Sequence, residues 1–118
     1  MATEATFAFL QGVTFTRDFS YYTPGTPNVP IDLSGQSLIF EIRDSDQFVK
    51  FSISSADGAN ANGSILEITD ADGGLFSLTV TDEDTHRLKF DSGFWWLGLN
   101  NAGAIRRIGH GDLTSAKP

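Results

Sequence analysis

The chain contains no cysteine. It therefore has no disulfide framework, no zinc site built on thiolates and no cysteine nucleophile. For the same reason, redox chemistry says nothing about the compartment in which the protein works. Function classes that depend on thiols are excluded.

Basic side chains are scarce. Eight Lys and Arg residues stand against fifteen Asp and Glu residues, which gives a formal net charge of -7 at pH 7. A surface of this sign repels the phosphates of nucleic acid and of anionic membranes. We expect neither nucleic acid nor a membrane among the partners.

Long apolar runs are also missing. No segment approaches the roughly 20 apolar residues that a membrane-spanning helix needs. The first residues, MATEATFAFLQG, have no basic start and no small-residue cleavage pattern. We therefore expect a soluble protein without a signal peptide that is cytosolic when made.

Apolar side chains are nevertheless plentiful. The 118 residues are 40% hydrophobic and 12% aromatic, with 10 Phe and 2 Trp. This content can form a sizeable core, and the length suits one domain. We expect a single domain over residues 1–118, with its core in residues 5–113 and a tail at residues 114–118.

Hydrophobic residues alternate with polar ones in short runs, which are separated by Gly, Pro, Asn and Asp. This period of two is typical of strands with one buried face. Seven or eight such strands are usual for a sandwich, so the sequence predicts an all-β fold. The runs read, in chain order, TFAFL, GVTFTRDFSYY, SLIFEIR, FVKFSI, SILEI, LFSLTV, GFWWLGLN and AIRRIG.

The connections between these runs differ in character. TPGTPNVP, at residues 23–30, contains three prolines and predicts a projecting loop or β-arm. Residues 54–64, SSADGANANGS, predict a mobile tip that includes a turn at Asn62-Gly63-Ser64. One short helical turn is expected near residues 81–88, with Thr81 as its N-cap and acidic residues beside its dipole.

No recognisable catalytic or metal-binding constellation is present. Asp70-Ala-Asp72-Gly73-Gly74 resembles the opening of a calcium loop, but it lacks the later ligands and is better interpreted as a hairpin turn. Neither histidine, His86 or His110, has a second one at metal-ligand spacing, and no GxSxG elbow occurs. We therefore expect no enzyme, no cofactor and no metal.

Trp95 and Trp96 are adjacent in a predicted strand, so one indole must point inward and the other outward. Trp95 shares its parity with Leu97 and Leu99, which assigns it to the core. Trp96 beside Gly98 is then a candidate protein-interface anchor or sugar platform. Partial burial under a loop is the other interpretation.

Arg17 interrupts the apolar side of its strand, between Phe15 and Phe19. A fully buried and unpaired guanidinium costs too much free energy. Its stem can lie along the edge of the core with the guanidinium paired to a carboxylate. Alternatively, Arg17 reaches a neighbouring subunit.

Taken in order, several segments resemble a family of small β-sandwich proteins of tailed bacteriophages, which is similar to the N-terminal domain of siphophage baseplate upper proteins. The chain departs from that family at Val13, where Asp is usual, and at Trp95-Trp96, where Tyr and a polar residue are expected. The segments that carry the resemblance are GVTFTRDFSYY, IDLSG with SLIFEIRDSD, GGLFSLTVTDEDTHRL, GFWWLGLN and GAIRRIGHGDLTS.

The resemblance implies an Ig-like antiparallel β-sandwich that docks on other virion proteins and has no catalytic residues. It implies a multicopy structural component of the tail, baseplate or neck, made in the bacterial host, homo-oligomeric or symmetrically repeated, and able to anchor a fibre. The alternatives are a capsid decoration protein and, more remotely, a carbohydrate-binding module. The interface candidates are Trp96, Arg17, Tyr22, Pro24 and Pro27.

Overall fold

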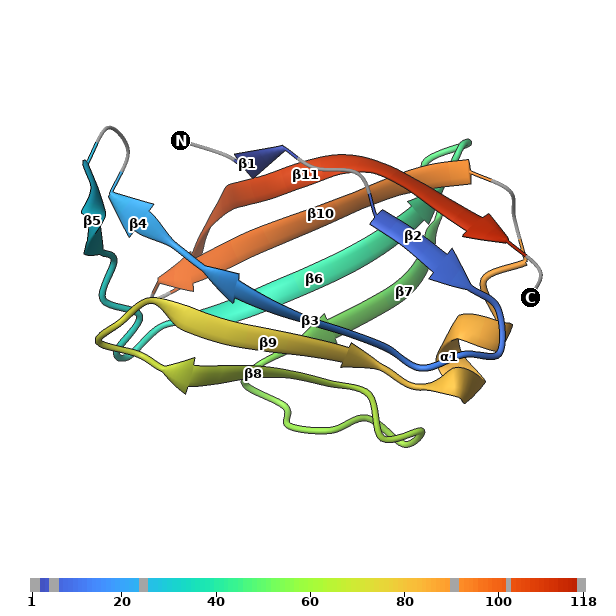
Figure 1. Cartoon of the computed structure of the whole chain (residues 1–118), viewed down its shortest axis with the longest axis horizontal. Helices are drawn as coiled ribbons and strands as arrows, with labels where there is room; N and C mark the ends of the chain where they lie inside the picture. Colours follow the sequence, from blue (N-terminus) through green and yellow to red (C-terminus); the bar gives the residue numbers. More distant parts are fainter. Residues whose placement is uncertain (1–2, 5–6, 24–25, 90–91, 102, 117–118) are drawn as a thin grey trace.

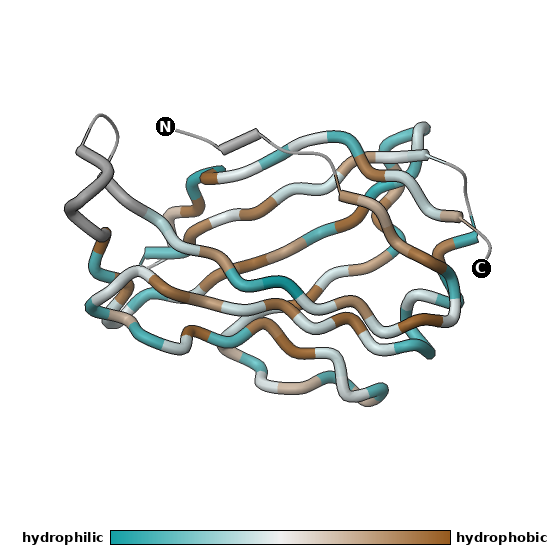
Figure 2. The backbone as a smooth tube through the Cα atoms, viewed as in Figure 1, coloured by the Kyte–Doolittle hydropathy of each residue, from teal (hydrophilic) through white to brown (hydrophobic). Residues whose placement is uncertain are grey.

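The computed structural model describes residues 3–4, 7–23, 26–89, 92–101 and 103–116. In this part of the chain, eight strands of four or more residues form two sheets that pack face to face (Figure 1). The predicted all-β sandwich is therefore confirmed. Hydrophobic residues alternate with residues of intermediate hydropathy along the strands, and hydrophilic residues occupy several of the turns (Figure 2).

The large sheet has the strand order β1-β11-β10-β6-β7, with β2 also paired to β11. Most of its pairs are antiparallel, but β1 and β2 both run parallel to β11. The predicted antiparallel sandwich therefore carries two parallel pairs at this edge. The strands are β1 (Thr3–Glu4), β2 (Phe7–Leu10), β6 (Ser37–Asp44), β7 (Val49–Ser54), β10 (Ser92–Asn101) and β11 (Ala104–Ala116).

The small sheet has the order β3-β9-β8 and is antiparallel throughout. A separate hairpin of β4 and β5 projects at one end of the molecule, and the short helix α1 lies at the other (Figure 1). The predicted β-arm and helical turn are both confirmed. The elements are β3 (Phe15–Ser20), β4 (Tyr22–Thr23), β5 (Thr26–Pro30), β8 (Ile65–Asp70), β9 (Leu75–Val80) and α1 (Asp82–His86).

The core between the sheets is rich in aromatic rings. Phe7 is central: its ring stacks on Trp95 of the large sheet, with centroids 4.4 Å apart, and lies 5.7 Å from Phe15 of the small sheet. Trp95 is only 2% exposed, and Leu97 and Leu99 are buried beside it. The inward parity predicted for Trp95 is therefore correct.

The end of the described chain is a strand. Residues 114–116 continue β11 and pair with Ala8, Phe9 and Leu10 of β2. The Ser115 hydroxyl is buried and donates to the Leu88 carbonyl oxygen at 2.7 Å. The prediction of a tail from residue 114 is wrong for residues 114–116, because these residues complete the pairing of β2.

The acidic segment after β8 is the hairpin turn that the sequence predicts. The Asp70 carboxylate accepts a hydrogen bond from the Gly73 amide at 3.2 Å. Gly74 has a φ of 66°, and a Cβ at this position would lie 2.5 Å from the Tyr21 carbonyl oxygen. Glycine is therefore required here both by backbone conformation and by space.

Candidate protein interface

Register places four residues of neighbouring strands in line across the large sheet, with their side chains on the face that points away from the core. One such row contains Ser52, Glu41, Trp96 and His110. The row beside it contains Val49, Arg43, Phe94 and Asp112. Trp96 thus occupies the central strand of this outer face, as its parity predicts.

The position of the Trp96 side chain depends on Gly98. A Cβ at Gly98 would lie 2.7 Å from Cζ3 of Trp96, closer than real contacts allow, and 3.1 Å from Cγ2 of Ile105, which is a tight contact. The six-membered ring of the indole therefore lies over Gly98, next to Ile105. Trp96 is half-buried in this position, where part of its indole lies against Gly98 of its own strand.

Several apolar residues of the large sheet and of its β6–β7 turn are exposed. The exposed fractions are 48% for Val49, 38% for Phe94 and 53% for Ile105. Phe48, in the turn before β7, is 66% exposed. We call these four residues and Trp96 the apolar band, and an exposed band of this kind is typical of a docking surface.

The described charges near the band largely compensate one another. The Arg43 guanidinium donates to Oε1 of Glu41 at 2.8 Å, and Lys50 lies 3.5 Å from the Asp44 carboxylate. Both pairs are partly exposed, so each contributes little to stability. The outer face is thus suited to an apolar contact with a polar rim.

Arg17 lies at the open edge of the sandwich, between the two sheets. Its guanidinium carbon is 4.8 Å from the centre of the Phe7 ring and 5.8 Å from that of Phe19. Among the residues that the structure describes, it forms no ion pair, so the expected carboxylate partner is replaced by aromatic faces. This exposed cation–π arrangement covers the aromatic core.

The remaining interface candidates belong to the arm. Tyr22 lies in β4 and Pro27 in β5, where the backbone pairs Tyr22 with Pro30 and Thr23 with Thr26. Their side chains, and Pro24 as a whole, lie outside the described residues. The arm is therefore described only as a backbone hairpin of β4 and β5 that projects from the sandwich.

A buried carboxylate anchors the loop between β7 and β8. Asp84 is 6% exposed, and its oxygens accept hydrogen bonds from Asn60 Nδ2 at 2.9 Å, from Asn62 Nδ2 at 2.7 Å and from the Ser64 hydroxyl. Thr81 is at the N-cap position but donates to the Asn62 carbonyl oxygen instead of capping the helix. The predicted mobile tip is thus tied down at residues 60–64, although the turn at Asn62-Gly63-Ser64 is confirmed.

These donors determine the ionisation of Asp84. Burial alone raises the pKa of this carboxyl group, but hydrogen bonds from Ser64, Asn60 and Asn62 and the charge of Arg87 outweigh burial and lower it below its ordinary value. Asp84 is therefore ionised at neutral pH. Its charged carboxylate accepts the hydrogen bonds of the loop, and Asp84 also lies in the first turn of α1, where the sequence predicts an acidic residue.

The described residues contain no group of three or more His, Cys, Asp or Glu side chains that could hold a metal ion. Nor does any helix among them have the length and apolar character needed to cross a membrane.

The whole arrangement has a counterpart among solved structures. The fold is similar to that of the N-terminal domain of phage TP901-1 ORF48. The TM-score is 0.57 with 11% sequence identity, and the match covers 99% of this chain and 86% of the other. No family model matches the sequence, and no curated protein matches it. The predicted resemblance to phage β-sandwich domains is confirmed as a likeness of fold.

Sequence reasoning missed two features of the structure. The first is the Asp84 anchor, because residues 60–64 and Asp84 are about twenty positions apart and meet only through the hairpin of β8 and β9. The recurrence of Asn and Ser at residues 60, 62 and 64 was the available signal. The second is the contact of Phe7 with Arg17, because β2 joins the sheet in parallel at the edge beside β3.

Proposed function

We propose that this protein is a non-enzymatic structural component of a tailed-phage virion, which docks on other virion proteins through the outer face of its large sheet. The observation that carries this proposal is the apolar band, with Trp96 on the central strand of that face. The likeness of fold to a domain of a phage protein supports the same assignment.

The proposal places the protein in several copies on the tail, baseplate or neck. Repeated weak contacts on a symmetric particle add up to stable attachment without a large interface in each copy. The projecting arm of β4 and β5 and the exposed Arg17 offer further contacts with neighbouring subunits. Decoration of the capsid would use the same face but a different partner.

The test begins with the virion itself. Quantitative mass spectrometry of purified particles should find the protein in multiple copies, and electron microscopy with a specific antibody should locate it on the tail rather than on the capsid. Absence from particles, or action on a soluble substrate in the infected cell, would contradict the proposal. The purified protein should show no hydrolase activity.

Variants then test the docking face. Trp96→Ala should weaken incorporation into particles about thirtyfold or more, since a central interface Trp contributes at least about 2 kcal/mol to binding. Leu75→Ala is the matched control, because Leu75 is also exposed and apolar but lies on β9 of the small sheet. Equal incorporation of both variants would exclude the apolar band as the docking surface.

A further inference from the structure

We infer that the unpaired edge of β8 and the groove beside it bind an extended, basic segment of a partner protein by strand addition. This inference rests on the proposed function, because it names the kind of partner segment that such a docking protein receives. It concerns a surface distinct from the apolar band.

The edge of β8 is open. This strand is the last of the small sheet and pairs only with β9. Among the residues that the structure describes, the backbone groups of residues 65–69 have no hydrogen-bonding partner beyond that ladder. A strand edge with free N–H and C=O groups is a template for another strand.

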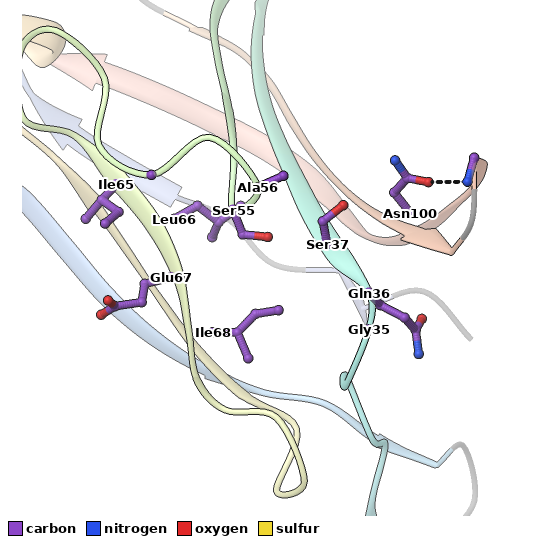
Figure 3. A pocket seen from close by; sticks show the side chains of 12 residues that line it. Gly35, Gln36, Ser37, Ser55, Ala56, Ile65, Leu66, Glu67, Ile68 and Asn100 are labelled. Carbon is purple, nitrogen blue, oxygen red and sulfur yellow. Dashed lines mark hydrogen bonds between the residues drawn. The ribbon is translucent and has the colours of Figure 1, made fainter.

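A groove of about 540 Å³ runs beside this edge. Leu66 and Ile68 of β8 line one side, and Ile68 extends across it toward the segment of Gln36 and Ser37 (Figure 3). The opposite wall is formed by residues from three segments, namely Gly35, Gln36, Ser37, Ser55, Ala56, Gly58, Asn100 and Gly103. A Cβ at Gly35 or Gly58 would meet no atom within 4 Å, so this wall leaves open space.

The charges favour a basic occupant. Asp18, Ser77 and Glu67 form one row across the outer face of the small sheet, and Glu67 ends that row at the open edge. Glu67 points away from the groove in Figure 3. A strand added to β8 extends the row, so its residue opposite Glu67 is most favourable as Lys or Arg. The net charge of -7 on the whole chain also favours a basic partner segment over an acidic one.

A second copy of this chain fits the edge less well. An antiparallel pairing of β8 with itself is centred on Glu67 or on Ile68, so it places Glu67 opposite either a second Glu67 or Thr69. The first register opposes like charges, which is destabilising, and the second gains no opposite charge. The occupant is therefore a segment of a different protein. It alternates small apolar residues, which face the groove, with outward residues that include a cation.

Synthetic peptides test this inference with the intact protein. The probe is a capped eight-residue peptide of alternating valine and threonine, with lysine replacing a central threonine, and its twin carries glutamate instead. Titration into ¹⁵N-labelled protein should shift the amide signals of residues 65–69, 35–37 and 55–58. The lysine peptide should bind about tenfold more tightly than its twin, because lysine opposite Glu67 is an attractive cross-strand pair and glutamate opposite Glu67 is a repulsive one.

Two pairs of variants make the test specific. Glu67→Lys should reverse the order of the two peptides, whereas Asp18→Lys, in the same row at the opposite edge of the sheet, should retain it. Ala56→Trp fills the groove and should abolish binding, whereas Ala61→Trp, exposed in the same loop but outside the groove, should not.

The outcomes separate this inference from the proposed function. If neither peptide binds, if Ala56→Trp binds like the parent, or if the chain dimerises through β8, strand addition by a partner is overturned, even where the protein is present in virions. If the peptides bind β8 as expected but the protein is absent from virions, the proposed function fails and the groove inference stands.

Discussion

At the scale of single residues, Asp84 shows how one carboxylate organises a long loop. Its two oxygens accept hydrogen bonds from Asn60, Asn62 and Ser64. The Ser64 hydroxyl oxygen in turn accepts a hydrogen bond from the Thr81 amide at 2.9 Å. Removing the charge leaves several buried donors without a strong acceptor. A buried donor that loses its partner costs about 1–3 kcal/mol.

We therefore predict that Asp84→Asn lowers the free energy of unfolding by about 1–3 kcal/mol at pH 7. The pKa of Asp84 is lowered in the folded protein, so its contribution is present above the pKa of the unfolded chain, about 3.9, and is lost as pH falls through the folded pKa. The difference between variant and parent should thus shrink toward zero on acidification.

Urea melts between pH 7 and pH 3 measure this dependence. Asp57→Asn is the control, since Asp57 is exposed in the same loop and the substitution removes the same charge at a cost of about 0.5 kcal/mol or less. A difference between Asp84→Asn and the parent that stays constant over this range would mean that the carboxylate does not titrate as the structure requires.

At the scale of elements, β11 connects both termini of the described chain to the centre of the large sheet. It pairs with β10 along one side and with β1 and β2 along the other. The Ser115 hydroxyl of β11 also donates a hydrogen bond to the carbonyl oxygen of Leu88, in the segment after α1. The last residues of this strand are therefore structural.

Ser115→Ala should cost about 1–3 kcal/mol, because the substitution leaves the buried Leu88 carbonyl without its hydrogen bond. Thr114→Ala, one residue away and exposed, should change stability by no more than about 0.5 kcal/mol. Thermal or urea melts of the two variants give the comparison. Identical melting curves for the two variants would mean that Ser115 does not stabilise the fold and that this end of the chain behaves as the predicted tail.

Elements whose signal is local could be predicted from the sequence, and those fixed by long-range pairing could not. Alternation identified the strand of Trp95 and Trp96, and the Asp70–Gly74 turn followed from backbone preferences. The extension of β11 could not be inferred, because residues 114–116 are ordered by β2, about a hundred positions earlier. The contact of Arg17 with Phe7 could not be inferred for the same reason, since Phe7 approaches Arg17 from β2.

The same limit applies to the candidate interface. The outward parity of Trp96 and its position beside Gly98 were predictable from spacing alone. The exposure of Val49, Phe94 and Ile105 on one face depends on strand order and register, which the sequence does not specify. The groove beside β8 is likewise a product of how the two sheets meet.

At the scale of the whole molecule, the two outer faces of the sandwich differ. The face of the large sheet carries the apolar band, whereas the rows across the small sheet contain Thr16, Thr79 and Ile65, followed by Asp18, Ser77 and Glu67. A largely polar face of this kind suits solvent, and an apolar one suits a protein surface. The molecule should therefore attach with a fixed orientation.

The absence of cysteine makes this orientation measurable, because a single introduced thiol is the only one in the chain. We predict that Ile105→Cys and Thr16→Cys both react readily with a maleimide in the free protein, since both positions are exposed. In assembled virions, Ile105→Cys should react at least about tenfold more slowly because the apolar band is covered, whereas Thr16→Cys should react as before. Labelling followed by mass spectrometry of purified particles gives both rates. Equal protection at the two positions, or protection at Thr16 alone, would show that the protein does not dock through the large sheet.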